Sequence, residues 1–240
     1  FTLFFFFPLF LQAENYPDYD ESVVIARLKS IEDPLVEYRY NSIVKGYIKS
    51  YLFWNRGKAE RILGRTVLYF PLIEEYLAKR DMPEKLKYLP VVESALYPHA
   101  VSPVGAMGLW QFMPATGREY GLLINEFVDE RKDPHKATQA ALDYLSRQYE
   151  KYGVWALALA AYNGGSGRVS RAIKRGRSKN FWNIRRYMPR ETRNYVPAYI
   201  AATYMMEYYK EHEIIPEYPP LDYQITEMIK VYANFSFYRI

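Results

Sequence analysis

One carboxylate stands alone inside an apolar stretch of this chain. Residues 88–96 read YLPVVESAL, and Glu93 is their only charged residue. Burial disfavours the ionised form of a carboxyl group, so such surroundings raise its pKa toward the range where it can donate a proton near neutral pH. Glu93 is therefore a candidate general acid. A second interpretation stays open, in which Glu93 lies at a helix surface or caps a neighbouring amide, because structural networks also perturb pKa values.

A loop suited to a neutral, hydroxyl-rich ligand follows nine residues later. Residues 102–114 read SPVGAMGLWQFMP. Two glycines three positions apart allow close approach of the backbone, and Ser102 and Gln111 supply neutral hydrogen-bonding groups. Trp110 and Phe112 supply flat apolar faces against which a sugar ring can lie. Acetamido sugars fit this mixture of groups. For Trp110 and Phe112 taken singly, packing in the core is the commoner role.

Two phenols are further candidates. Tyr162 and Asn163 close an apolar segment ahead of a glycine pair, and Tyr195 follows an Arg-Asn pair. A tyrosine hydroxyl near Glu93 could orient its carboxyl group or hold a substrate group. The chain contains 25 tyrosines, so composition alone does not distinguish these two.

The composition excludes several chemistries. The absence of cysteine rules out disulfides, thiol nucleophiles, zinc-thiolate sites and a lipidated N-terminal cysteine. His99, His135 and His212 are too scattered to predict a metal centre. No glycine-rich loop follows a strand pattern and opens a helix, which argues against nucleotide chemistry. We therefore expect neither a metal nor another cofactor.

The charge is modestly basic. Thirty-two lysines and arginines against 27 acidic residues give a formal net charge of +5. This excess favours an anionic partner, but it is too small and too dispersed to indicate nucleic acid. The length of 240 residues suits one main domain with a small appendage.

The hydrophobic periodicity predicts a mostly α fold. Asp133 and Pro134 form a helix start, and Gly153 stops the helix that follows. Residues 154–162 are nearly all apolar and predict a wholly buried helix. A third long helix is expected over residues 194–210.

The N-terminal part, residues 23–80, shows apolar residues three and four positions apart, as amphipathic helices do. The residues expected to divide it into helices of ordinary length are Pro34, Gly46, Gly57, Gly64 and Pro71.

An apolar run over residues 3–11 is far shorter than a membrane-spanning helix requires, and it predicts an export signal cleaved after Ala13. An extended, buried N-terminal strand is the alternative. We expect no transmembrane helix. The predicted division is a signal remnant at 1–13, an N-terminal helical region at 14–75, a main domain at 76–212 and a proline-rich tail at 213–240. Within the tail, residues 223–240 are expected to be strand-like.

Several separated motifs together resemble a known family. The chain resembles the lytic transglycosylases with a soluble-transglycosylase, goose-lysozyme-like domain, and within them the membrane-bound lytic murein transglycosylase D type. The resemblance covers about residues 65–205, and several motifs in one order are more specific than any single one. The stretches that carry it are 69–71, 89–96, 102–116, 128–131, 161–164 and 191–197.

This resemblance implies a lysozyme-like helical domain with an N-terminal helical extension. It implies cleavage of the β-1,4 bond between N-acetylmuramic acid and N-acetylglucosamine in peptidoglycan, leaving a 1,6-anhydro ring, in the periplasm or cell envelope. Glu93 matches the single catalytic acid/base of the family. Ser102, Gln111, Met113 and Tyr162 match positions that line the substrate cleft in the family. Asn163 matches the start of the turn after the cleft helix, and Tyr195 matches a tyrosine proposed to support the catalytic acid.

The number of carboxylates bears on the reaction. Ordinary glycosidases use two carboxylates, one as acid and one as nucleophile or base, whereas the motif region here offers one well-placed carboxylate, Glu93. An attack by the 6-hydroxyl group of the substrate needs no second enzyme carboxylate. A hydrolytic muramidase using Asp129 or Asp133 is the alternative enzyme, although Asp133 is expected to cap a helix and Asp129, Glu130 and Arg131 to form a charged turn. A catalytically silent wall-binding protein is the other alternative.

Overall fold

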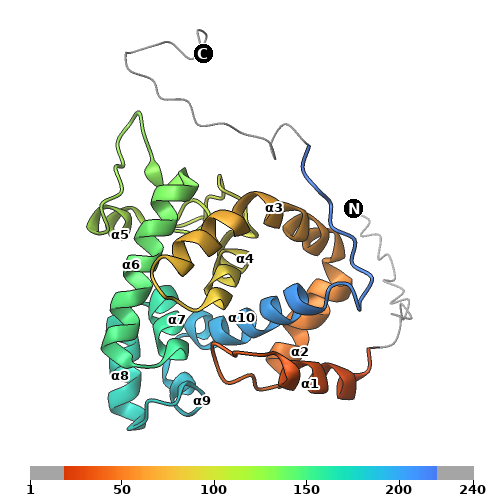
Figure 1. Cartoon of the computed structure of the whole chain (residues 1–240). Helices are drawn as coiled ribbons and strands as arrows, with labels where there is room; N and C mark the ends of the chain where they lie inside the picture. The colour runs from red at the N-terminus through yellow and green to blue at the C-terminus, as the bar shows by residue number, and fades with distance from the viewer. Residues whose placement is uncertain (1–18, 221–240) are drawn as a thin grey trace, which may run out of the picture.

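The structure of the protein is a computed structural model that describes residues 19–220 (Figure 1). This part of the chain is helical, with only isolated β-bridges between extended residues. The predicted mostly α fold is therefore confirmed. The export signal and the end of the tail were predicted in segments that lie outside the described residues.

The N-terminal part forms three helices and one irregular turn. They are α1 (Glu21–Ser30), α2 (Ser42–Lys49), a π-helical turn (Ser50–Trp54) and α3 (Arg56–Ala78). Pro34 lies between α1 and α2, as predicted.

The rest of the described chain forms shorter helices around two long ones. The first elements are a 3-10 turn (Glu84–Tyr88), α4 (Leu89–Ser94), α5 (Pro114–Glu119), a 3-10 turn (Glu130–Lys132) and α6 (Pro134–Tyr152). Then follow α7 (Trp155–Gly164), α8 (Ser166–Gly176), α9 (Phe181–Ile184), a 3-10 turn (Arg185–Tyr187) and α10 (Arg190–Tyr208).

Helix α7 lies at the centre of the fold. Its sequence has no polar face because neighbouring helices surround it. It packs against α6, α8 and α10, and its residues 156–161 are all buried. Helix α10 in turn packs against α2, α4 and α7. One hydrophobic core therefore runs from Val24 in α1 to Ile214 beyond α10, and it includes both the N-terminal helices and the central ones.

The ends of α6 are those predicted. The Asp133 carboxylate accepts hydrogen bonds from the backbone N–H groups of His135 and Lys136, at 2.8 and 3.0 Å. Gly153 closes the helix with a φ of +70°, in the left-handed region that glycine adopts without strain.

Four of the predicted helix breaks are wrong. Gly46 lies within α2, and Gly57, Gly64 and Pro71 lie within α3, which runs unbroken for 23 residues across residue 75. A glycine in a helix costs only about 1 kcal/mol relative to alanine, which burial of the neighbouring apolar residues offsets.

Gly64 has a packing role instead. A Cβ atom at this position would lie 1.6 Å from the backbone oxygen of Glu217, so only glycine lets the two segments approach. The N–H group of Glu217 donates to the backbone oxygen of Glu60 at 2.9 Å. The segment after α10 thus lies against α3 up to at least residue 217.

The third predicted helix begins four residues earlier than expected, at Arg190, and ends at Tyr208. The missed first turn follows Pro189 and carries Arg190 and Glu191, both exposed.

A buried arginine braces the loop between α4 and α5. Arg131, only 5% exposed, pairs with Asp129 at 2.6 Å. Its guanidinium group also donates to the backbone oxygens of Gly105 and Phe112, at 2.7 and 3.0 Å. The predicted charged turn therefore exists, and through Arg131 it holds the backbone of residues 102–114 in place.

Replacement of Arg131 by methionine should strongly destabilise the fold. The change leaves Asp129 and two carbonyl groups without their partner, and breaking one side of a buried pair costs about 3–5 kcal/mol. Arg147→Met is the matched control, because the Arg147–Glu119 pair has side chains 67% and 61% exposed and should contribute under about 1 kcal/mol. Urea unfolding at neutral pH measures both. Equal losses would contradict the bracing role.

Candidate active site

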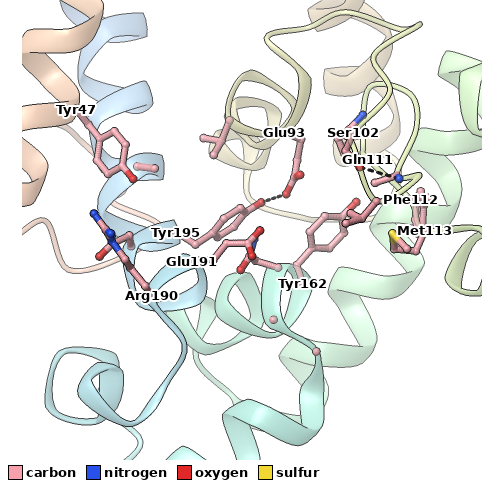
Figure 2. A pocket seen from close by; sticks show the side chains of 18 of the residues that line it. Tyr47, Glu93, Ser102, Gln111, Phe112, Met113, Tyr162, Arg190, Glu191 and Tyr195 are labelled. Atoms are coloured by element: carbon pink, nitrogen blue, oxygen red, sulfur yellow. Dashed lines mark hydrogen bonds between the residues drawn. The ribbon is translucent and has the colours of Figure 1, made fainter.

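A cleft of about 1250 Å³ crosses the molecule above α7 (Figure 2). Its walls come from five separate parts of the chain: the α2–α3 region, α4 with the loop that leads into α5, Tyr144 of α6, the α7–α8 junction and the first turns of α10. Glu93 lies at its middle, between Tyr195 and Tyr162.

The end of α4 places Glu93. The helix stops directly after Ser94, because Ala95 and Leu96 both adopt left-handed backbone conformations, with φ of +55° and +56°. Such conformations carry strain in residues other than glycine and persist only where the surroundings hold them. The Ser94 hydroxyl group is buried and donates to the backbone oxygen of Leu109 at 2.9 Å. Glu93 is thus fixed on the last turn of a short helix tied to the facing loop.

The surroundings of Glu93 suit a proton donor. Burial raises the pKa of its carboxyl group, a hydrogen bond donated by the Tyr195 hydroxyl group lowers it, and the negative charge of Glu191 raises it; the net pKa is about 7. A carboxylic acid with this pKa is populated in both protonation states near neutral pH. Burial and the charge of Glu93 hold the pKa of Tyr195 well above its usual value, so Tyr195 remains a neutral donor.

Tyr162 faces Glu93 from α7. Its hydroxyl group donates to the backbone oxygen of Trp110 at 2.7 Å, and its ring meets the ring of Phe112 edge to face, with centroids 6.2 Å apart. The hydroxyl group therefore already fixes the loop, and the ring contributes to the cleft wall.

Two polar side chains shape the opposite wall. The Ser102 hydroxyl group accepts from the backbone N–H group of Ala106 at 2.9 Å. The side-chain amide of Gln111 donates to the backbone oxygens of Gly108 and Ala100, at 2.9 and 3.1 Å. These contacts leave the Gln111 side-chain oxygen without a hydrogen bond among the described residues, so it can accept one from a ligand.

All the residues predicted from sequence line this one cleft; they are Glu93, Ser102, Gln111, Met113, Tyr162, Asn163 and Tyr195. Met113 is 41% exposed at its edge. The side-chain oxygen of Asn163 is buried and has no partner within residues 19–220, which makes it a second free acceptor.

The two aromatic residues of the loop divide between core and cleft. Trp110 is fully buried, and its indole N–H group donates to the Thr138 hydroxyl group at 2.9 Å, so its role is core packing. Phe112 is 3% exposed and lies in the cleft wall.

Sequence reasoning missed two groups of lining residues. The first comes from the start of α10 and includes Arg190 and Glu191; Pro189 could have marked that helix start. The second comes from the N-terminal region and includes Tyr47, Tyr51 and Lys58, for which periodicity indicates only a helix face.

The carboxylates named as rivals of Glu93 lie elsewhere. Asp129 pairs with Arg131, Glu130 pairs with Lys136, and Asp133 caps α6. Glu191 is the second carboxylate among the described residues that line the cleft.

Within residues 19–220, no three acidic or histidine side chains gather in a way that could hold a metal ion. Nor does a helix in this range have both the length and the apolar character needed to cross a membrane.

The comparison with known families agrees with this geometry. Residues 71–185 match the family model of the transglycosylase SLT domain. The resemblance inferred from the motifs is thereby confirmed.

Two curated proteins are similar in sequence to this chain. The chain is 39% identical over 165 residues to the membrane-bound lytic murein transglycosylase D of Escherichia coli (strain K12), which covers 67% of this chain and 36% of that protein. It is 32% identical to a putative tributyltin chloride resistance protein of Alteromonas sp. (strain M-1), over 58% of this chain and 65% of that protein. The chain thus spans about a third of the first relative, 36% of its length.

The solved complex of the 70-kDa soluble lytic transglycosylase with bulgecin A aligns with a TM-score of 0.52 at 24% identity, covering 71% of this chain and 31% of that one. This likeness concerns the fold, and it agrees with the predicted lysozyme-like helical domain.

Replacement of Glu93 by glutamine should stabilise the protein at alkaline pH. The pKa of Glu93 is about 7 in the folded state and about 4.3 in an unfolded chain, so wild type loses stability as pH rises between these values. Glutamine cannot ionise, yet its oxygen can still accept from Tyr195. We expect a gain on the order of 1–3 kcal/mol at pH near 8 and little gain near pH 4.

Chemical unfolding at both pH values measures this difference, with Glu126→Gln as the control because Glu126 is exposed and outside the cleft. A gain that does not depend on pH would contradict the raised pKa.

Proposed function

We propose that this chain is a peptidoglycan lytic transglycosylase of the cell envelope. It would cleave the β-1,4 bond between N-acetylmuramic acid and N-acetylglucosamine without water and leave 1,6-anhydromuramic acid ends. The family match and the relatives support the reaction class. The observation that carries the proposal is the carboxyl group of Glu93, with a pKa of about 7, in the middle of a long cleft.

The reaction would use Glu93 twice. Its protonated carboxyl group gives a proton to the glycosidic oxygen as the bond from that oxygen to the anomeric carbon breaks. The carboxylate then takes the proton of the muramyl 6-hydroxyl group as that oxygen bonds to the anomeric carbon, aided by the substrate's acetamido group. Glu93 ends protonated again, and no water is consumed.

Tyr195 would support both steps. Its hydroxyl group donates to Glu93 Oε1, which leaves the other carboxyl oxygen for the substrate. This hydrogen bond favours the carboxylate, whereas burial favours the acid, so neither form is too stable to react. Gln111 and Asn163 offer free acceptors for N–H or O–H groups of acetamido sugars.

Hydrolysis is the second candidate, because Glu191 lines the same cleft. Inverting glycosidases use a carboxylate across the bond from the acid to activate water. Glu191 is exposed on the first turn of α10, and no hydrogen bond within the described residues orients it, which favours the intramolecular route.

Glu93→Gln should abolish turnover, since glutamine can neither give nor take the proton. We expect release of soluble products from purified sacculi to fall by at least about a hundredfold. Mass spectrometry should show wild-type products one water lighter than hydrolysed muropeptides. Full activity of the variant would refute the role of Glu93, and hydrolysed ends from wild type would refute the transglycosylase.

The pH dependence should follow the protonated form of Glu93. Activity on a given strand should decline as pH rises through about 7. Glu191→Gln removes a negative charge that raises this pKa, so the decline should move to lower pH while anhydro products persist. Loss of nearly all turnover in Glu191→Gln at every pH would instead support hydrolysis with Glu191 as the base.

A further inference from the structure

The cleft extends beyond the segment that matches the SLT domain. Residues 47–58, from α2, the π-helical turn and the start of α3, line its far end, whereas the match begins at residue 71. Figure 2 shows Tyr47 and Arg190 at this end, with Glu93 in the middle and Met113 at the other. We call residues 47–58 the N-terminal wall.

The wall presents two phenols to the cleft. Tyr47 and Tyr51 are four residues apart, which places them on one helix face, and α2 is held in place by packing against α10. Neither hydroxyl group forms a hydrogen bond within residues 19–220. Burial raises the pKa of Tyr51 to about 12, so it stays a neutral donor at physiological pH.

The irregular turn in the wall is a built feature. Asn55 donates its backbone N–H to the oxygen of Ser50, five residues back, at 2.8 Å, and its side-chain amide donates to the Ser50 hydroxyl group, also at 2.8 Å. Such π-helical turns are rare and occur frequently at functional sites. Here the turn brings Ser50 and Asn55 into the cleft wall alongside Tyr51.

The charge at this end is positive. Lys58 and Arg190 both line the cleft, both are exposed, and neither forms an ion pair within the described part of the chain. Arg168 lines the same cleft, where its guanidinium group donates to the Gly164 backbone oxygen. Glu191 is the opposing charge. Two cations without partners beside two phenols suit a saccharide that carries carboxylate groups.

We propose that the N-terminal wall and Arg190 form an additional binding subsite for a muramyl unit bearing an acidic peptide. The phenol rings would contact the apolar face of the sugar, their hydroxyl groups would donate to its oxygens, and Lys58 and Arg190 would pair with peptide carboxylates. The subsite rests on the proposed function, since it extends the grip on the strand that Glu93 cuts.

The proposal predicts a dependence on strand length and on the peptide. A strand long enough to reach from Glu93 to the wall gains binding energy that a short strand cannot. Tyr47→Ala should therefore raise KM about tenfold for long, peptide-bearing strands and leave short ones unchanged. Lys58→Ala should raise KM about threefold for peptide-bearing strands only, with an effect that fades as salt rises.

The test compares long and short strands, each with and without peptides, and measures kcat and KM separately. Tyr47→Phe is a milder variant that keeps the ring, and thermal midpoints check that each variant folds. Lys29→Ala is the matched control, because Lys29 is exposed on α1 and lies outside the cleft. It should match wild type on every strand.

Binding of the same strands to Glu93→Gln, alone and combined with Tyr47→Ala or Lys58→Ala, separates the two proposals. Weaker binding of long, peptide-bearing strands to the combined variants would support the subsite. A wild type that cleaves strands while the wall variants match it in KM and binding would overturn the subsite alone. A wild type that releases no anhydro products would overturn the proposed function.

Discussion

Burial of the Glu93 carboxyl group opposes its ionisation, and the hydroxyl group of Tyr195 opposes that effect by stabilising the carboxylate. The balance leaves a pKa of about 7, at which one group can serve as both acid and base. Much of the surrounding structure maintains this balance. The left-handed residues after Ser94 end α4 at the cleft, and α10 holds Tyr195 against it.

The facing loop depends on a second buried charge. Arg131 binds the backbone at Gly105 and Phe112, and its own backbone oxygen lies so near Gly108 that a Cβ there would be 1.7 Å away. The loop therefore has little freedom to collapse into the cleft. A rigid wall opposite the acid would hold a bound strand in one position, which the proposed intramolecular attack requires.

The sequence predicted those features that depend only on neighbouring residues. Asp133 and Gly153 bound α6 because capping and left-handed turns depend on adjacent residues. Glu93 could be identified because a charge inside an apolar run is costly wherever that run folds. The motifs around it added Ser102, Gln111 and Met113 of the facing loop and Tyr162 and Asn163 at the end of α7, which line the cleft.

The features that the sequence did not predict depend on packing between segments far apart in the chain. Gly64 remains within α3 because another segment approaches it, and no local signal reveals that approach. Trp110 can be fully buried because Thr138, 28 residues later, accepts the hydrogen bond of its indole N–H group. Tyr47 lies at the cleft because α2 packs against α10, a helix about 150 residues later in the sequence.

The most direct measurement of the central claim is the titration of the Glu93 carboxyl carbon by NMR, with Glu93→Gln used to assign the signal. The structure predicts a midpoint near pH 7 in the free protein and a lower midpoint when Tyr195 is intact than in Tyr195→Phe. A midpoint near 4.3, the value of an ordinary glutamate, would show that Glu93 is ionised at neutral pH and cannot be the proton donor.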